Sequence, residues 1–235
     1  MNRRKFNRAV VSAGAGGLIA LAYAQAHALN LGGITDGEAA SGLTAALEKG
    51  ALSAIGLLGK TDGFLGNDKV RIPLPGFLES AGKMMKKLGQ GKRIDELVTS
   101  MNRAAEAAVP LAKDLLVGAI KSMSVTDAKK ILSGGDTSVT TFFADKTRAP
   151  LNTTFLPVVT KATEKVGLAQ KYNEVAGKAS GLGLLKKEDA KIEQYVTAKS
   201  LDGLYFMIGE EEKKIRQNPV GSGSAILKKV FGSLK

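Results

Sequence analysis

The chain has 235 residues, a formal net charge of +12, one histidine and no cysteine. The absence of cysteine excludes disulfides, thiolate nucleophiles and thiolate-bound metals. The single histidine, His27, lies in a segment that we expect to be removed, so the mature chain would hold no Ser-His-Asp triad and no imidazole-bound metal. We expect no metal and no cofactor. With 5% aromatic residues, little surface is left for stacking on bases, so we also expect no nucleic-acid partner.

The first 28 residues have the layout of an export signal. Residues 3–8 carry four basic side chains and no acidic one, and residues 9–24 are apolar but shorter than the roughly 20 residues that span a bilayer. Alanines at A-x-A spacing follow, so we expect cleavage after Ala26 or Ala28. The run RRKFNR also resembles a twin-arginine signal. We predict a signal peptide over residues 1–28 and a periplasmic protein; an uncleaved N-terminal helix is the alternative.

The next part of the chain alternates helical patterns with glycine and proline turns. Apolar residues recur at helical spacing over residues 36–58, and a glycine-containing turn ends the pattern. Two prolines make residues 70–75 extended, and the second can begin a helix over residues 76–88. The longest periodic stretch covers residues 94–120. Pro110 lies inside it and predicts a kink or a division into two helices.

Helical patterns continue through the second half of the chain. Ser124 or Thr126 can cap a helix that ends at Ser133-Gly134-Gly135. Residues 136–151 are rich in β-branched side chains and also fit a strand, but their helical neighbours favour a short helix from about Ser138. Two more helices are predicted over residues 153–175 and 188–208, and Asn218-Pro219 marks a helix stop.

These elements predict an all-α fold, with a single-domain multi-helix bundle over residues 29–220 joined by short Gly/Pro loops. Residues 221–235 are predicted to be a linker and a C-terminal amphipathic helix. One face of that helix is apolar and lysines lie opposite it or at its edge: Ile226, Leu227, Val230, Phe231 and Leu234, with Lys228 and Lys229. Such a helix can dock on its own bundle, on a partner or on an anionic membrane surface.

Five stretches along the chain carry a family resemblance. They are DGFLGNDKVRIPLPGFL (62–78), NRAAEAAVP (102–110), DAKKIL (127–132), SLDGLYFMIGEEEKKIRQNP (200–219) and KKVFGS (228–233). Together they resemble a family of bacterial proteins described as domain of unknown function 4197, and they occur in the family's order over nearly all of the mature chain. The resemblance implies an exported helical protein and implies no particular reaction.

Two groups of polar residues near the middle of the chain are candidates for a binding site. Asn102, Arg103 and Glu106 either line a cleft or form a polar network that fixes the register of their helix. Asp145, Lys146 and Arg148 form the second group, in which Arg148 either holds a carboxylate or phosphate with two hydrogen bonds or forms an ion pair within the chain.

A third candidate group is the charged run that begins at Glu210. Three consecutive glutamates precede two lysines and an arginine, and Glu211 and Arg216 are the residues that we single out as ligand contacts. The structural alternative is a solvated helix face on which Glu210 pairs with Lys214, and Glu212 with Arg216, at a spacing of four residues.

The export signal, the abundant aliphatic residues and the missing catalytic motifs predict a non-enzymatic envelope protein. We expect it to bind an apolar or amphipathic small molecule or another envelope protein. One alternative is an envelope hydrolase or lyase that works through two carboxylates, with Glu106 and Glu211 as the pair to test. Another is a membrane-surface protein that acts through its C-terminal helix.

Overall fold

The computed structural model describes residues 35–76, 91–135, 138–164 and 191–218, together with residues 79, 83, 87, 89, 172 and 173. Its elements are α2 (Asp36–Leu58), α4 (Gly91–Ala108), the 3-10 helix η2 (Val109–Ala112), α5 (Lys113–Lys121), α6 (Val125–Ser133), α7 (Ser138–Glu164) and α9 (Ile192–Gln217). These ranges contain helices and no strands, which confirms the predicted all-α multi-helix fold.

Several predicted segments lie outside the described residues. They are the signal peptide, most of the helix over residues 76–88, the second half of the helix over residues 153–175, and the linker and amphipathic helix over residues 221–235. Within the ranges that the structure does describe, no helix is long and apolar enough to cross a membrane.

Helix α2 has the predicted bounds, and local hydrogen bonds explain both of its ends. Thr35 and Glu38 form a capping box, in which the Glu38 N–H donates to Thr35 Oγ1 (3.2 Å) and the Thr35 N–H donates to Glu38 Oε2 (2.9 Å). Gly59 follows the last turn, and its N–H donates to the carbonyl oxygen of Ile55. Helix α6 begins with the same kind of capping box at Ser124, which was one of the two predicted caps.

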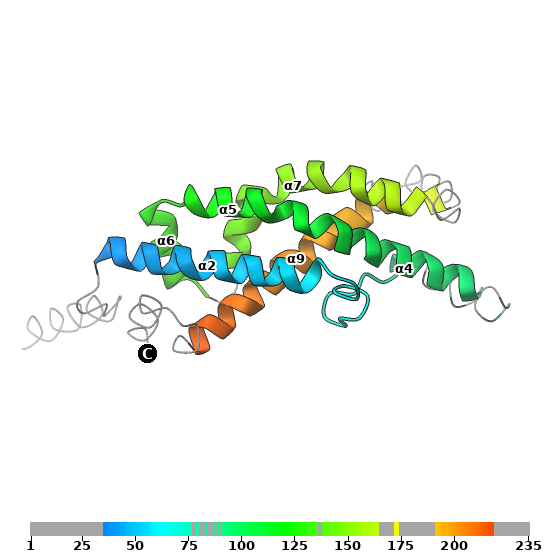
Figure 1. Cartoon of the computed structure of the whole chain (residues 1–235), viewed down its shortest axis with the longest axis horizontal. Coiled ribbons are helices and arrows are strands. Elements are labelled where there is room, and N and C mark those ends of the chain that lie inside the picture. The colour runs from blue at the N-terminus through cyan, green and yellow to red at the C-terminus, as the bar shows by residue number, and fades with distance from the viewer. Residues whose placement is uncertain are drawn as a thin grey trace, which may run out of the picture.

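The long periodic stretch over residues 94–120 is divided, as Pro110 predicted. Helix α4 ends at Ala108, Pro110 lies at the start of the 3-10 turn η2, and α5 continues the chain from Lys113. Proline has no N–H to donate and its ring crowds the preceding turn, so an α-helix cannot run through it without distortion. Figure 1 shows α4 and α5 as one long, bent rod.

The prediction of two separate helices over residues 138–151 and 153–175 is wrong. Helix α7 runs without a break from Ser138 to Glu164, although Pro150 and Pro157 lie inside it. Buried residues continue at a spacing of four through the predicted break, at Phe143, Thr147, Leu151, Phe155 and Val159. Packing along α4 and α9 therefore holds the helix together where the local sequence favours a break.

Helix α9 covers Ile192–Gln217, so it continues beyond Ile208, where the predicted helix over residues 188–208 ends. The charged run after Ile208 continues the helix, and Asn218, at the predicted stop, is its C-cap. In Figure 1, α9 (orange) crosses diagonally behind the other long helices, and it packs most extensively on α7 and then on α2. The fully buried ring of Phe64, from the turn after α2, lies against Gly203 of this helix.

Candidate functional site

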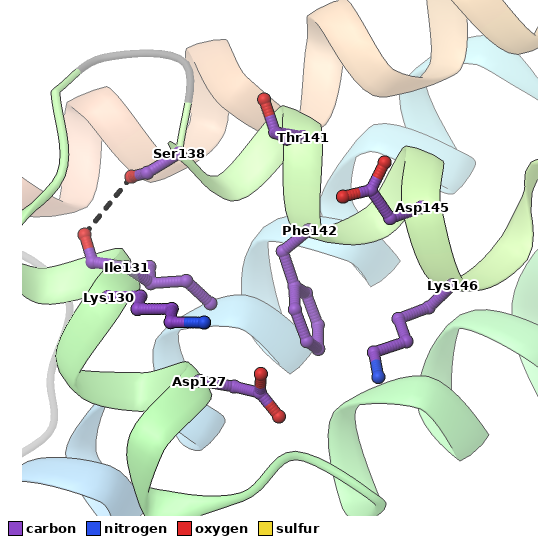
Figure 2. Close-up of a pocket in the computed structure, with 8 residues that line it drawn as sticks. All are labelled: Asp127, Lys130, Ile131, Ser138, Thr141, Phe142, Asp145 and Lys146. Carbon is purple, nitrogen blue, oxygen red and sulfur yellow. Dashed lines mark hydrogen bonds between the residues drawn. The ribbon is translucent and has the colours of Figure 1, made fainter.

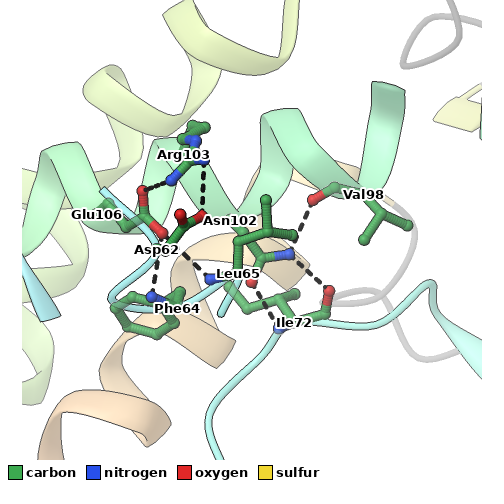
Figure 3. Close-up of polar contacts among 8 residues, drawn as sticks. All are labelled: Asp62, Phe64, Leu65, Ile72, Val98, Asn102, Arg103 and Glu106. Carbon is green, nitrogen blue, oxygen red and sulfur yellow. Dashed lines mark hydrogen bonds and ion pairs between the residues drawn. The ribbon is translucent and has the colours of Figure 1, made fainter. Parts of the chain in front are cut away.

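Asn102 is fully buried and holds the extended segment after α2 against α4. Its side-chain amide donates to the carbonyl oxygens of Ile72 (2.9 Å) and Val98 (2.8 Å), and its Oδ1 accepts from the N–H of Ile72 (2.8 Å). One side chain thus replaces a strand partner for Ile72 (Figure 3). Because the extended segment has no sheet to pair with, its buried backbone groups need such a substitute.

Glu106, one helical turn further along α4, anchors the turn that precedes this segment. Its Oε1 accepts from the N–H groups of Phe64 and Leu65, both at 3.1 Å, and its Oε2 accepts from Arg103 at 2.7 Å. Arg103 also forms an ion pair with Asp62 at 2.8 Å, and hydrogen bonds to both carboxylates raise its pKa. Asp62 has a φ of 64°, the left-handed conformation that Asp adopts more readily than most residues.

The geometry of Asn102, Arg103 and Glu106 favours the second of the two predicted interpretations, a polar network that fixes structure. Asn102 and Glu106 each form two hydrogen bonds with the backbone of residues 64–72, and both side chains are buried. Only Arg103 reaches the surface, with 38% of its side chain exposed.

Arg148 and Asp145 were predicted as one group, but the structure directs them to different neighbours. Arg148 forms an ion pair with Asp202 of α9 at 2.9 Å, and its guanidinium lies 5.1 Å from the centre of the Tyr205 ring. Tyr205 is buried, and burial raises the pKa of its hydroxyl, which is hydrogen-bonded to Thr147 at 2.9 Å. Arg148 is therefore already paired with a carboxylate of its own chain.

The charged run of α9 is paired differently from the prediction. Glu210 forms an ion pair with Lys69 at 2.9 Å, and Lys214 pairs with Glu211, so the expected pair of Glu210 with Lys214 is wrong. Glu211 also accepts from Ser53 of α2 at 2.7 Å. Lys69 lies 141 positions before Glu210, and Ser53 lies 158 positions before Glu211. Both separations are beyond the reach of any helix-periodicity rule. The side chain of Arg216 lies outside the described residues.

Glu106 and Glu211 are not brought together. Glu106 binds the N–H of Phe64, whose ring lies against Gly203 of α9, while Glu211 binds Ser53 of α2. Gly203 and Glu211 are eight residues apart on one helix, a rise of about 12 Å along its axis. Among the described residues the two carboxylates share no hydrogen-bond or ion-pair partner, and Glu106 does not line the pocket that contains Glu211, so the structure does not support this pair as a glycosidase site.

A pocket of about 490 Å³ lies between α6 and α7. We call it the α6–α7 pocket, and its lining residues are Asp127, Lys130, Ile131, Ser138, Thr141, Phe142, Asp145 and Lys146. Figure 2 shows the ring of Phe142 projecting into its centre, with the side chains of Lys130 and Lys146 ending on either side of the ring. The pocket combines apolar side chains with both signs of charge.

Hydrogen bonds close one end of the α6–α7 pocket and fix its acidic edge. Ser138 Oγ donates to the carbonyl oxygen of Ile131 at 3.0 Å, which ties the start of α7 to the end of α6. Asp127 accepts from Ser124 N (3.1 Å) and Ser124 Oγ (2.8 Å), and these bonds lower the pKa of the Asp127 carboxyl. Asp127 therefore stays ionised while it completes the capping box of α6.

Of the residues that line the α6–α7 pocket, Asp145 and Lys146 were in a predicted candidate group. Phe142 and Lys146 are four residues apart and Asp127 and Lys130 are three apart, so each pair shares a helix face, and this signal was available. That the two faces meet at one cavity depends on how α6 packs on α7, which no local pattern encodes.

Comparison with known proteins identifies a family. A family model described as "Protein of unknown function (DUF4197)" matches residues 33–232 of the chain. Neither the comparison with curated proteins nor the comparison with solved structures gave a match. The geometry of the chain's own residues is therefore the basis for assigning a function.

Proposed function

Since the chain belongs to the DUF4197 family of proteins of unknown function, we propose from its own residues that it is an exported, non-enzymatic binding protein of the cell envelope. Its ligand is an amphipathic small molecule that enters the α6–α7 pocket. This pocket is the observation that carries the proposal.

The chemistry of the α6–α7 pocket supports an amphipathic ligand. Small-molecule pockets have volumes of about 300–1,000 Å³ and combine apolar walls with a few polar groups. The pocket has a volume of about 490 Å³, apolar surface from Phe142 and Ile131, and charged groups at its edge. Both apolar residues are buried and hold the two helices together, so the apolar wall is preformed.

Export is supported by the basic, apolar and small-residue pattern of residues 1–28. The match to the family model begins at residue 33, after both expected cleavage positions. This boundary fits a family domain that begins where a removable leader ends. A periplasmic location would place the α6–α7 pocket among envelope lipids and cell-wall precursors, which include many amphipathic molecules.

Native mass spectrometry of the protein purified from the periplasm without detergent tests the proposal. We expect a discrete adduct, which solvent extraction would then identify, and a mass that lacks the first 26 or 28 residues. Titration of the extracted compound should shift the amide resonances of residues 127–146 and leave those around Ser53 and Glu211 unchanged. Retention of the full N-terminus would contradict export, and shifts confined to other regions would contradict the site.

The composition of residues 224–235 favours a second candidate function, attachment to an anionic membrane surface. The apolar residues and lysines of residues 224–235 are arranged as in interfacial amphipathic helices. Co-sedimentation with anionic liposomes, with and without residues 222–235, tests this function. Equal binding by the two forms would exclude the C-terminal segment as the membrane contact.

A further inference from the structure

We infer that the α6–α7 pocket selects ligands with an anionic head group, which Lys130 and Lys146 bind while the apolar part of the ligand contacts Phe142. This inference rests on the proposed function, because it names the class of ligand for that same site. The ligand class is an amphiphile with a single carboxylate, phosphate or sulfonate group.

The two ammonium groups come from different helices and converge on one cavity. Lys130 extends from α6 and Lys146 from α7, and Figure 2 shows both side chains reaching into the pocket on opposite sides of the Phe142 ring. Among the described residues neither lysine forms an ion pair, whereas the neighbouring Lys129 and Arg148 bind Asp36 and Asp202. The two pocket lysines are therefore available to an incoming anion.

The carboxylates of the α6–α7 pocket offset only part of this charge, although Asp127 attracts both Lys130 and Lys146. Asp127 lies in the first turn of α6, where a carboxylate is favoured by the positive end of the helix, and its Oδ2 accepts both hydrogen bonds from Ser124. In Figure 2 the carboxylate of Asp145 points away from both ammonium groups. A head group between the lysines thus meets two cations and one carboxylate that is already hydrogen-bonded.

Lysine at both positions indicates selection by charge and not by head-group shape. An ammonium group is a point charge on a flexible stem, whereas arginine would impose a planar, two-pronged geometry. Both side chains are exposed, so their attraction for an anion is screened by salt over a Debye length of about 10 Å at 0.1 M. We therefore expect binding that depends on the sign of the head group and weakens at high salt.

Three probes with chains of about ten carbons test this inference: decanoate, decanol and decyltrimethylammonium. All are kept below the solubility limit of decanol and the micelle concentrations of the two ionic probes, with acetate as a head-group-only control. Affinities are measured by NMR titration of the full periplasmic protein at low salt. We expect decanoate to bind at least tenfold more tightly than decanol, decyltrimethylammonium to bind most weakly, and shifts to be confined to residues 127–146. Acetate should bind far more weakly than decanoate, because it lacks the apolar part.

The double variant K130A/K146A should bring the affinities for decanoate and decanol to within about twofold of each other. Its matched control is K121A/K161A, which removes two exposed lysines outside the α6–α7 pocket and should leave the preference intact. Equal affinity of the wild type for the two probes, or a preference that survives in K130A/K146A, would overturn the anion inference and leave the amphiphile site standing. If none of the three probes shifts residues 127–146, the proposed function fails as well.

Discussion

Replacing Glu106 by alanine tests whether a buried carboxylate on α4 holds the turn after α2 in place. Glu106 accepts hydrogen bonds from the N–H groups of Phe64 and Leu65, and it is 5% exposed. The variant leaves both N–H groups without an acceptor. Each unsatisfied buried donor costs about 1–3 kcal/mol, and water can reach the half-buried Leu65 more easily, so we expect a loss of about 2–4 kcal/mol.

Urea unfolding followed by circular dichroism at 222 nm measures this loss. Glu106→Gln keeps one acceptor oxygen and loses the ion pair with Arg103, so it should cost about 1 kcal/mol. Asp62→Asn removes only the exposed end of the network, where 61% of the side chain is accessible, and should change stability by less than about 1 kcal/mol. A loss below about 0.5 kcal/mol for Glu106→Ala would refute the anchoring role.

Three further predictions use the same unfolding assay. Gly203→Ala should cost about 1–3 kcal/mol, because the new Cβ would lie 2.7 Å from the buried ring of Phe64. Its control is Gly118→Ala, which has free space around the new Cβ and should stabilise α5 by about 0.5–1 kcal/mol. If Gly203→Ala were the more stable of the two variants, α9 would pack differently from the structure. Asn102→Asp should cost about 3 kcal/mol or more at pH 7, since it places a carboxylate against two carbonyl oxygens. Stability should partly return on acidification, because the protonated carboxyl becomes a donor, and a pH-independent loss would contradict this geometry. The folded-state pKa of Asp127 is lowered by its hydrogen bonds with Ser124. The stabilising contribution of Asp127 is therefore full above the unfolded-state pKa and is lost as the pH falls through the folded-state pKa. The stability difference between the wild type and Asp127→Asn should vanish in strong acid, and a constant difference would exclude a charge effect.

Much of the helical framework was predictable because its signals are local. The bounds of α2 follow from apolar periodicity and a terminal glycine, and Ser124 marks the start of α6 by a capping pattern within four residues. Pro110 divides α4 from α5 because its ring and missing N–H act on the preceding turn alone. The match to the DUF4197 family confirms the resemblance that five stretches of sequence suggested.

Other helix bounds depended on partners far along the chain. Two helices were predicted over residues 138–151 and 153–175, yet α7 continues from one range into the other because its buried face packs on α4 and α9. Helix α9 extends to Gln217 through a highly charged run in which Glu210 and Glu211 bind side chains from the region around α2. Tertiary packing outweighs local propensity at these positions, since propensity differs by less than about 1 kcal/mol for most residues.

The sequence by itself determined the helical class and most helix starts, because each depends on residues within one or two turns of one another. Only the tertiary structure decided which polar residues face solvent and which hold the fold. Asn102 and Glu106 looked like site residues, but their partners are backbone groups 30 to 42 positions earlier. The α6–α7 pocket likewise exists only where two helices pack, because a cavity is a property of the space between elements and not of either sequence pattern.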